Sequence, residues 1–189
     1  GCKEKGSQEN TGSSPVATDS AKVDSVSGPK AVLADSATLM NLAKEILQHA
    51  EKKEYSKIAD YIHPTKGIRF SPYTYVDTAE HKHFTAAEFR EQVEKNAKKK
   101  VLWGTSDPLG EDILLTVEGY FKEFGYDKKY LEEGSFGFNQ VIGSSTVINN
   151  IEEAYPGATF AAAYWVPNDE EKDPYEWGSV RLVFALANG

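Results

Sequence analysis

The chain has 189 residues, which is enough for one well-packed domain and short for two. Its formal net charge of −8 argues against nucleic-acid binding, which usually leaves a basic footprint on a protein. No run of about 18 apolar residues is present, so no segment of the sequence is expected to span a membrane as a helix.

The N-terminal segment, residues 1–34, differs in composition from the rest of the chain. Every Trp, Tyr and Phe lies at or after Tyr55, and residues 1–30 are mostly small, polar or charged. Such a segment buries too little apolar surface to offset the entropy lost when its backbone is ordered. We therefore expect residues 1–34 to form a disordered tether and residues 35–189 to form a single folded domain.

Cys2, the only cysteine, lies in this polar segment. It is either an exposed thiol, a partner in an intermolecular disulfide, or a site of modification. The stretch GCKEKGSQENTGSSPVATDS resembles the start of a bacterial lipoprotein, in which removal of a signal peptide leaves a cysteine that is then acylated. The resemblance implies that a lipidated Cys2 anchors the protein to a membrane of the bacterial cell envelope, on the extracytoplasmic side, since two or three acyl chains hold a protein firmly.

Helices are expected at the start of the domain. Apolar residues at helical spacing predict a helix over residues 37–52, with Ser36 as its N-cap. The same spacing predicts a second helix from Tyr55 that stops before Pro64. The stretch GIRF then alternates as a short strand does.

The stretch FTAAEF, residues 84–89, carries the clearest signal for the start of a helix. Thr85 and Glu88 fit a capping box, and the two flanking phenylalanines fit a hydrophobic staple. We expect this helix to continue to the lysine run at 98–100, where positive charge suits the C-terminal end of the helix dipole.

Strand signals dominate the C-terminal half. Residues 101–103 read as a short strand, and Thr116 fits the cap of a short helix. Further strands are expected at residues 138–142, 158–166 and 178–187. The last two are expected to pair as a hairpin around an acidic loop, and helices followed by strands favour an α+β fold. The final Asn188-Gly189 is a hairpin-turn signal, which either marks a frayed tail or precedes a return strand in a longer natural chain; we favour the return strand.

The pattern as a whole resembles the nuclear transport factor 2-like superfamily. The segments YSKIADYIHPTKGIRFSPY and WGSVRLVFALANG carry the resemblance, and they are also similar to stretches of secreted or lipid-anchored bacterial proteins of uncharacterised function. The resemblance implies a cone-shaped fold with N-terminal helices packed on a curved antiparallel sheet. This chain departs from the pattern because it lacks the last aromatic strand. The fold hosts isomerases, dehydratases and cyclases as well as non-catalytic binding proteins, so it does not name a function.

Two of the three arginines, Arg69 and Arg181, interrupt apolar strands. A buried guanidinium without a partner is costly, so each must form an ion pair or point into a wet cavity. One explanation is a structural ion pair with a carboxylate such as Asp112 or Glu118. The other is that an arginine clamps an anionic ligand in the cone, where aromatic side chains form the walls. The candidate walls are Tyr73, Tyr75, Trp103, Tyr164 and Trp165.

Metal binding is considered at two places. His81 and His83 face one side of an extended segment, and Asp77, Glu80 or Glu88 lies close enough in sequence to add a carboxylate. Histidines in a polar loop are usually solvated, so we expect no metal there. The acidic loop at 169–176 lacks the glycine of the EF-hand pattern, and we interpret it as a solvated hairpin tip.

Catalytic motifs are not found in the sequence. No nucleophile elbow, phosphate-binding loop, dinucleotide fingerprint or zinc motif occurs, so no cofactor and no catalytic residue is expected. His63, at the end of a predicted helix, is the alternative as a general base. We therefore expect an extracytoplasmic, lipid-anchored protein whose domain binds a small molecule or a protein without catalysis. The alternative is an isomerase- or dehydratase-type enzyme that uses a pocket carboxylate or His63.

Overall fold

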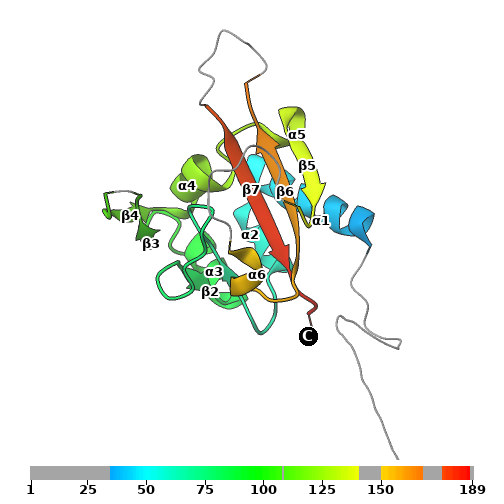
Figure 1. The fold of residues 1–189 in the computed structure, drawn as a ribbon. Coiled ribbons are helices and arrows are strands. Elements are labelled where there is room, and N and C mark those ends of the chain that lie inside the picture. Colours follow the sequence, from blue (N-terminus) through cyan, green and yellow to red (C-terminus); the bar gives the residue numbers. More distant parts are fainter. Residues whose placement is uncertain (1–34, 108, 141–149, 168–175, 188–189) are drawn as a thin grey trace, which may run out of the picture.

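The computed structural model describes residues 35–107, 109–140, 150–167 and 176–187 as short helices and three small antiparallel sheets (Figure 1). The expected α+β class is therefore confirmed. The predicted tether with Cys2, most of the acidic loop at 169–176 and the final Asn188-Gly189 pair lie outside the described residues.

The N-terminal helices form where the apolar spacing predicts them. Helix α1 spans Ser36–Glu51, and its cap is Asp35 rather than Ser36, because the Asp35 carboxylate accepts the Thr38 N–H at 2.8 Å. Helix α2 spans Tyr55–Ile58 and continues as a 3₁₀ turn, η1, over Ala59–Tyr61. The chain then extends at Ile62, ahead of Pro64, as expected.

Strand β1, Ile68–Arg69, pairs with strand β2, His83–Phe84, and helix α3, Ala86–Glu94, follows directly. The predicted capping box between Thr85 and Glu88 is confirmed in both directions. The predicted extension of α3 to the lysine run is wrong. Beyond Glu94 the chain turns, and the side-chain amide of Gln92 donates to the Asn96 carbonyl at 3.0 Å, so the lysines do not complement a helix end.

The middle of the chain forms a hairpin and a helical segment. Strands β3, Val101–Thr105, and β4, Asp112–Leu115, pair across a bulge. Helix α4, Val117–Tyr120, is capped by Thr116 as predicted and runs into a π-helical turn, η2, over Phe121–Gly125. A further short helix, α5, covers Tyr130–Glu133.

The third sheet has the strand order β5-β6-β7. Its strands are β5, Ser135–Phe138, β6, Thr159–Trp165, and β7, Gly178–Phe184. The predicted hairpin of the last two strands is confirmed. Strand β5 begins earlier than predicted and ends before Asn139, which adopts a φ of 53° and turns the chain away. The short helix α6, Ile151–Ala154, was not predicted.

Two clusters of buried side chains hold these elements together. The first core surrounds Phe70, Phe89 and Trp103 and joins α2, α3, α4 and the first two sheets. The second core is smaller and packs Tyr130 of α5 against Ala163 and Trp165 of β6. In Figure 1, α1 and α2 lie behind the β5-β6-β7 sheet, and β7 runs along its near side. None of the helices in the described ranges has the length and apolar character needed to cross a lipid bilayer.

Candidate functional site

Arg181 lies at the centre of β7, where it is opposite Ala162 of β6, and Ala162 in turn is opposite Gly137 of β5. Cross-strand neighbours share a face of the sheet, so Arg181 lies on the same face as Ala162 and Gly137. Neither of these small residues has a side chain that could accept a hydrogen bond from the guanidinium. Burial lowers the pKa of the Arg181 guanidinium. Within the described residues, no carboxylate lies within ion-pair distance of it.

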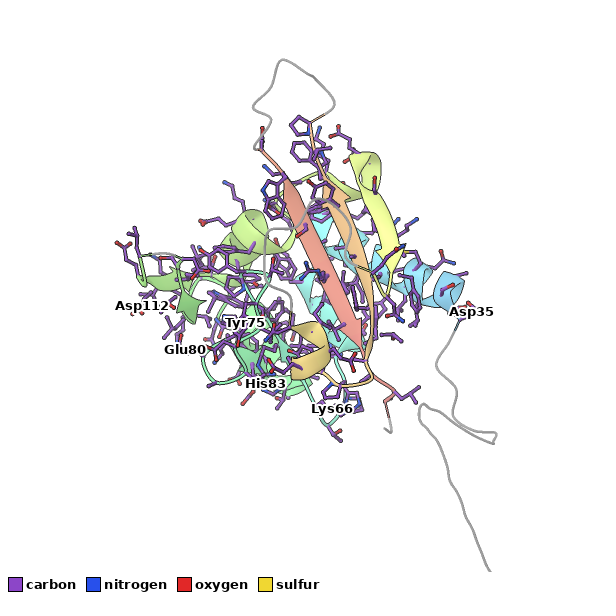
Figure 2. The ribbon with its side chains drawn as sticks, viewed as in Figure 1. Asp35, Lys66, Tyr75, Glu80, His83 and Asp112 are labelled. Carbon is purple, nitrogen blue, oxygen red and sulfur yellow. The ribbon has the colours of Figure 1, made fainter. Side chains whose placement is uncertain are left out.

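The two carboxylates expected to pair with an arginine are placed elsewhere. Glu118 forms an exposed ion pair with Lys53 at 2.9 Å. Asp112 lies exposed on the β3-β4 hairpin, and Figure 2 shows it at the far left of the view while β7 runs through the centre. Arg90, in contrast, is an exposed arginine with a partner, Asp60, at 2.5 Å. Within the described residues, neither Asp112 nor Glu118 pairs with an arginine, and Arg69 and Arg181 differ in this respect from Arg90.

Arg69 lies on the polar face of the β1-β2 ladder. It is opposite His83, and just outside the two strands Ser71 Oγ lies 2.9 Å from His81 Nδ1. The Nε of Arg69 is buried and has no hydrogen-bond partner among the described residues. A charged group held in this way carries a desolvation cost that an incoming anion would offset.

His81 is held as a neutral ring on this polar face. Its Nδ1 accepts the Asp77 N–H at 3.1 Å, so the proton of the neutral imidazole lies on Nε2. Burial lowers the pKa of His81, and the carboxylates of Asp77 and Glu80 only partly oppose this effect. Gly104 makes room for the ring, since a Cβ there would lie 3.1 Å from His81 Cδ2.

The other two candidate histidines serve as local clamps. His63 Nε2 donates to the Leu186 carbonyl at 2.5 Å, and its Nδ1 accepts the Lys66 N–H at 3.0 Å. His83 Nε2 donates to the Lys66 carbonyl at 2.6 Å. Because both nitrogens of His63 are occupied, the ring ties the end of the α2-η1 segment to the chain after β7 and has no free nitrogen for proton transfer. Across the described ranges, no group of three or more metal-ligating side chains is found.

The aromatic side chains proposed as walls do not converge on one surface. Trp103 is completely buried in the first core, where it stacks on Tyr120 with 4.2 Å between the ring centroids. Trp165 belongs to the second core and donates to Glu133 at 2.7 Å. Tyr73 packs edge-on against Phe124, and Tyr75 is half-exposed.

One aromatic pair, Tyr164 and Trp177, does lie on the Arg181 face of the sheet. Of the two, only Tyr164 was predicted as a candidate wall residue. Tyr164 is opposite Ser179, so it shares a face of the sheet with Arg181 one row away. Its ring stacks on Trp177 with 6.1 Å between the centroids, and Trp177 is 42% exposed. Trp177 directly precedes Gly178, the first residue of β7. This position at the start of a predicted strand was the sequence signal that could have identified it as a candidate site residue.

A carboxylate that was not predicted as a site residue, Asp127, has a shifted pKa. Asp127 Oδ1 accepts the hydroxyl of the fully buried Tyr130 at 2.7 Å. Burial raises the pKa of Asp127, and the hydrogen bond from Tyr130 opposes the shift without cancelling it. The neighbouring Lys128 pairs with Glu176 instead, at 3.1 Å. Asp127 lies three positions before Tyr130, but the sequence does not reveal that Tyr130 is fully buried and Asp127 partly buried.

Asp127 makes stability depend on pH with a defined sign. The raised pKa means that the folded chain holds this proton more tightly than the unfolded chain, so the stabilisation is present at low pH and is lost as pH rises through the folded pKa. Asp127→Asn should remove this component and should leave the protein equally or more stable at neutral pH. Urea unfolding at a series of pH values measures the change.

Asp77 is the control for Asp127, because its pKa is shifted in the opposite direction. The N–H groups of Glu80 and Ala79 lower the pKa of Asp77, so its stabilisation is present at neutral pH and is lost on acidification. Asp77→Asn should therefore flatten the acid side of the profile. A loss of neutral-pH stability in Asp127→Asn would contradict the account and would indicate a paired carboxylate.

Comparison with protein-family models, curated proteins and solved structures gives no match to this chain.

Proposed function

We propose that this protein is an extracytoplasmic, lipid-anchored protein of the bacterial cell envelope whose α+β domain binds an anionic ligand or protein without catalysis. In this proposal Cys2 carries the lipid, residues 1–34 are the tether, and the domain has the cone-like arrangement of the nuclear transport factor 2-like superfamily. The observation that carries the binding role is the pair of strand arginines, Arg69 and Arg181, which have no carboxylate partner among the described residues.

The physical reason is the cost of a half-buried guanidinium. A buried charge is normally retained only where a counter-charge or several hydrogen bonds repay its desolvation. Here the described side chains provide neither, while Arg90 has Asp60. Arginine also forms bidentate hydrogen bonds to carboxylates and phosphates, which lysine cannot form. A bound anion would therefore provide the counter-charge that Arg69 and Arg181 lack among the described residues.

The test compares three leucine variants by thermal unfolding. Arg69→Leu and Arg181→Leu should leave the melting temperature unchanged or raise it in chloride buffer, because each removes a charge that has no carboxylate partner in the described part of the chain. Citrate, inorganic phosphate and glutamate at matched ionic strength should stabilise the wild type, by about 2.7 kcal/mol at a hundredfold excess over Kd, and should lose this effect in the variant whose arginine binds them.

Arg90→Leu is the matched control for this experiment. It should respond to anions as the wild type does, and it corrects for the general stabilisation that excluded salts produce. If Arg69→Leu and Arg181→Leu are strongly destabilised and no anion changes this, both arginines are structural and the binding proposal fails.

A second candidate function, an isomerase- or dehydratase-type enzyme, is favoured by one observation, the raised pKa of Asp127. A general acid or base works best when its pKa lies near the working pH. A carbon-13 NMR titration of the Asp127 carboxyl distinguishes the two functions. A midpoint in the neutral range would favour the enzyme, whereas a midpoint within the ordinary range of carboxyl groups would favour the binding domain. His63 gives the enzyme no support because both of its ring nitrogens are occupied.

A further inference from the structure

Strand β7 forms the outer edge of its sheet and has no partner on its far side in the described part of the chain. The strand order is β5-β6-β7, and β6 is the only described element against which β7 packs extensively. The edge is seven residues long, contains no proline, and pairs with β6 in one continuous register. Natural proteins usually blunt or cover such an edge, because its unpaired backbone groups recruit other strands.

The register identifies the backbone groups that point outward. Phe160 of β6 bonds toward the β5 side, since its carbonyl accepts the Asn139 N–H at 2.8 Å. Backbone groups alternate along an antiparallel strand, so Ala161 and Ala163 of β6 bond to β7 instead. Their partners on β7 are Leu182 and Val180. The N–H and C=O groups of the alternate residues therefore point outward: Ser179, Arg181 and Val183.

Side chains give this edge a specific character. Arg181 is the central residue of β7 and extends from the face that also carries Tyr164. Val180, on the opposite face, packs on the second core. An added strand would thus meet a cation on one face, at the middle of the edge, and apolar side chains on the other face.

The central charge also selects among possible partners. If two copies of this chain paired their β7 edges with all seven residues overlapped, Arg181 would lie directly opposite Arg181 of the second copy. Like charges directly opposite on paired strands are destabilising. Arg181 therefore disfavours self-association and favours a strand with a carboxylate at that position.

We propose that the outer edge of β7 binds an extended peptide segment of a partner protein, which adds as a further strand and places an Asp or Glu opposite Arg181. This inference rests on the proposed binding function and names the partner. The residues on either side of the carboxylate are apolar and lie beside Val180 and Leu182. Backbone hydrogen bonds to Ser179, Arg181 and Val183 supply affinity, and the carboxylate supplies specificity.

The test uses a fluorescent peptide of about nine residues that alternates valine and threonine, with a glutamate at the central threonine position. Fluorescence anisotropy with the full chain should show binding, and replacing the glutamate by glutamine should weaken it about tenfold. Arg181→Gln should bind both peptides equally and weakly. Equal affinity of the wild type for the two peptides, or binding of neither, overturns the proposal.

Two further measurements keep the test independent of the folding of Arg181→Gln. Ser179→Pro removes one outward N–H that β6 does not use, so it should preserve the fold and abolish peptide binding. Hydrogen exchange should show rapid exchange at Ser179, Arg181 and Val183 in the free protein and about tenfold slower exchange with the peptide bound.

The remaining outcomes identify other occupants of the edge. Protection of these three amides in the free monomer means that another segment of the same chain covers the edge, and a dimer that Ser179→Pro dissociates means that a second copy does; either result overturns the proposal. If the peptide fails while citrate or phosphate still stabilises the wild type through Arg69 or Arg181, only the strand-addition inference fails and the proposed function stands.

Discussion

Trp103→Ala should destabilise the protein by about 3–5 kcal/mol, the usual cost of truncating a fully buried large aromatic side chain. The Trp103 ring is completely buried, stacks on Tyr120, and donates through Nε1 to the Leu115 carbonyl at 2.9 Å. Its removal leaves a cavity in the first core and an unpaired carbonyl. Urea unfolding followed by circular dichroism measures the loss.

Trp177→Ala is the matched control, because it is the same substitution at a side chain that is 42% exposed. Its expected cost is about 1 kcal/mol or less, since the side chain is largely exposed and the ring contact shown among the described residues is the stack on Tyr164. Similar losses in the two variants would contradict the assignment of Trp103 to the core and would return it to the candidate ligand walls.

Gly67→Ala should be the most damaging glycine substitution in the β1-β2 region. Gly67 has a φ of 72°, and a Cβ there would overlap the Phe84 carbonyl oxygen and lie 2.7 Å from His83 Nε2. Phe84 is part of β2, so the oxygen cannot move without disturbing the ladder that holds Arg69. We expect a loss of roughly 3 kcal/mol, which combines backbone strain with this overlap.

Gly110→Ala separates the two causes of the expected destabilisation, which are backbone strain and steric overlap. Gly110 has nearly the same φ, 71°, and a Cβ there would meet no atom within 4 Å. It should therefore show only the cost of the left-handed conformation, about 1–2 kcal/mol. Equal losses in the two variants, measured by urea unfolding, would show that the close approach of Gly67 to β2 does not hold in solution.

Local signals predicted local structure well. The capping box at Thr85 and Glu88 and the cap at Thr116 depend on residues three positions apart, so the sequence contains all the information that they need. The β6-β7 pairing is also a relation between strands that follow one another in the sequence. The helix over residues 37–52 followed from its apolar spacing.

Long-range relations could not be predicted in the same way. Glu118 pairs with Lys53, which lies 65 positions away, rather than with an arginine. Trp103 and Trp177 look alike in the sequence, yet one is buried and the other is exposed. The Asp127–Tyr130 pair was missed because the pKa of a carboxyl group depends on burial by segments distant in the chain. The candidate site was predicted in part: the sequence singled out Arg69 and Arg181, but not their surroundings.

The proposed function requires that a lipid on Cys2 holds the binding domain at the membrane. Intact mass spectrometry and palmitate labelling of the full-length protein from its native host test it most directly, with Cys2→Ser as the control. We expect acylated protein in the membrane fraction and unlabelled, released Cys2→Ser, because each buried CH₂ contributes about 0.8 kcal/mol to anchoring. An unmodified thiol, or unchanged membrane fractionation of Cys2→Ser, would contradict the claim.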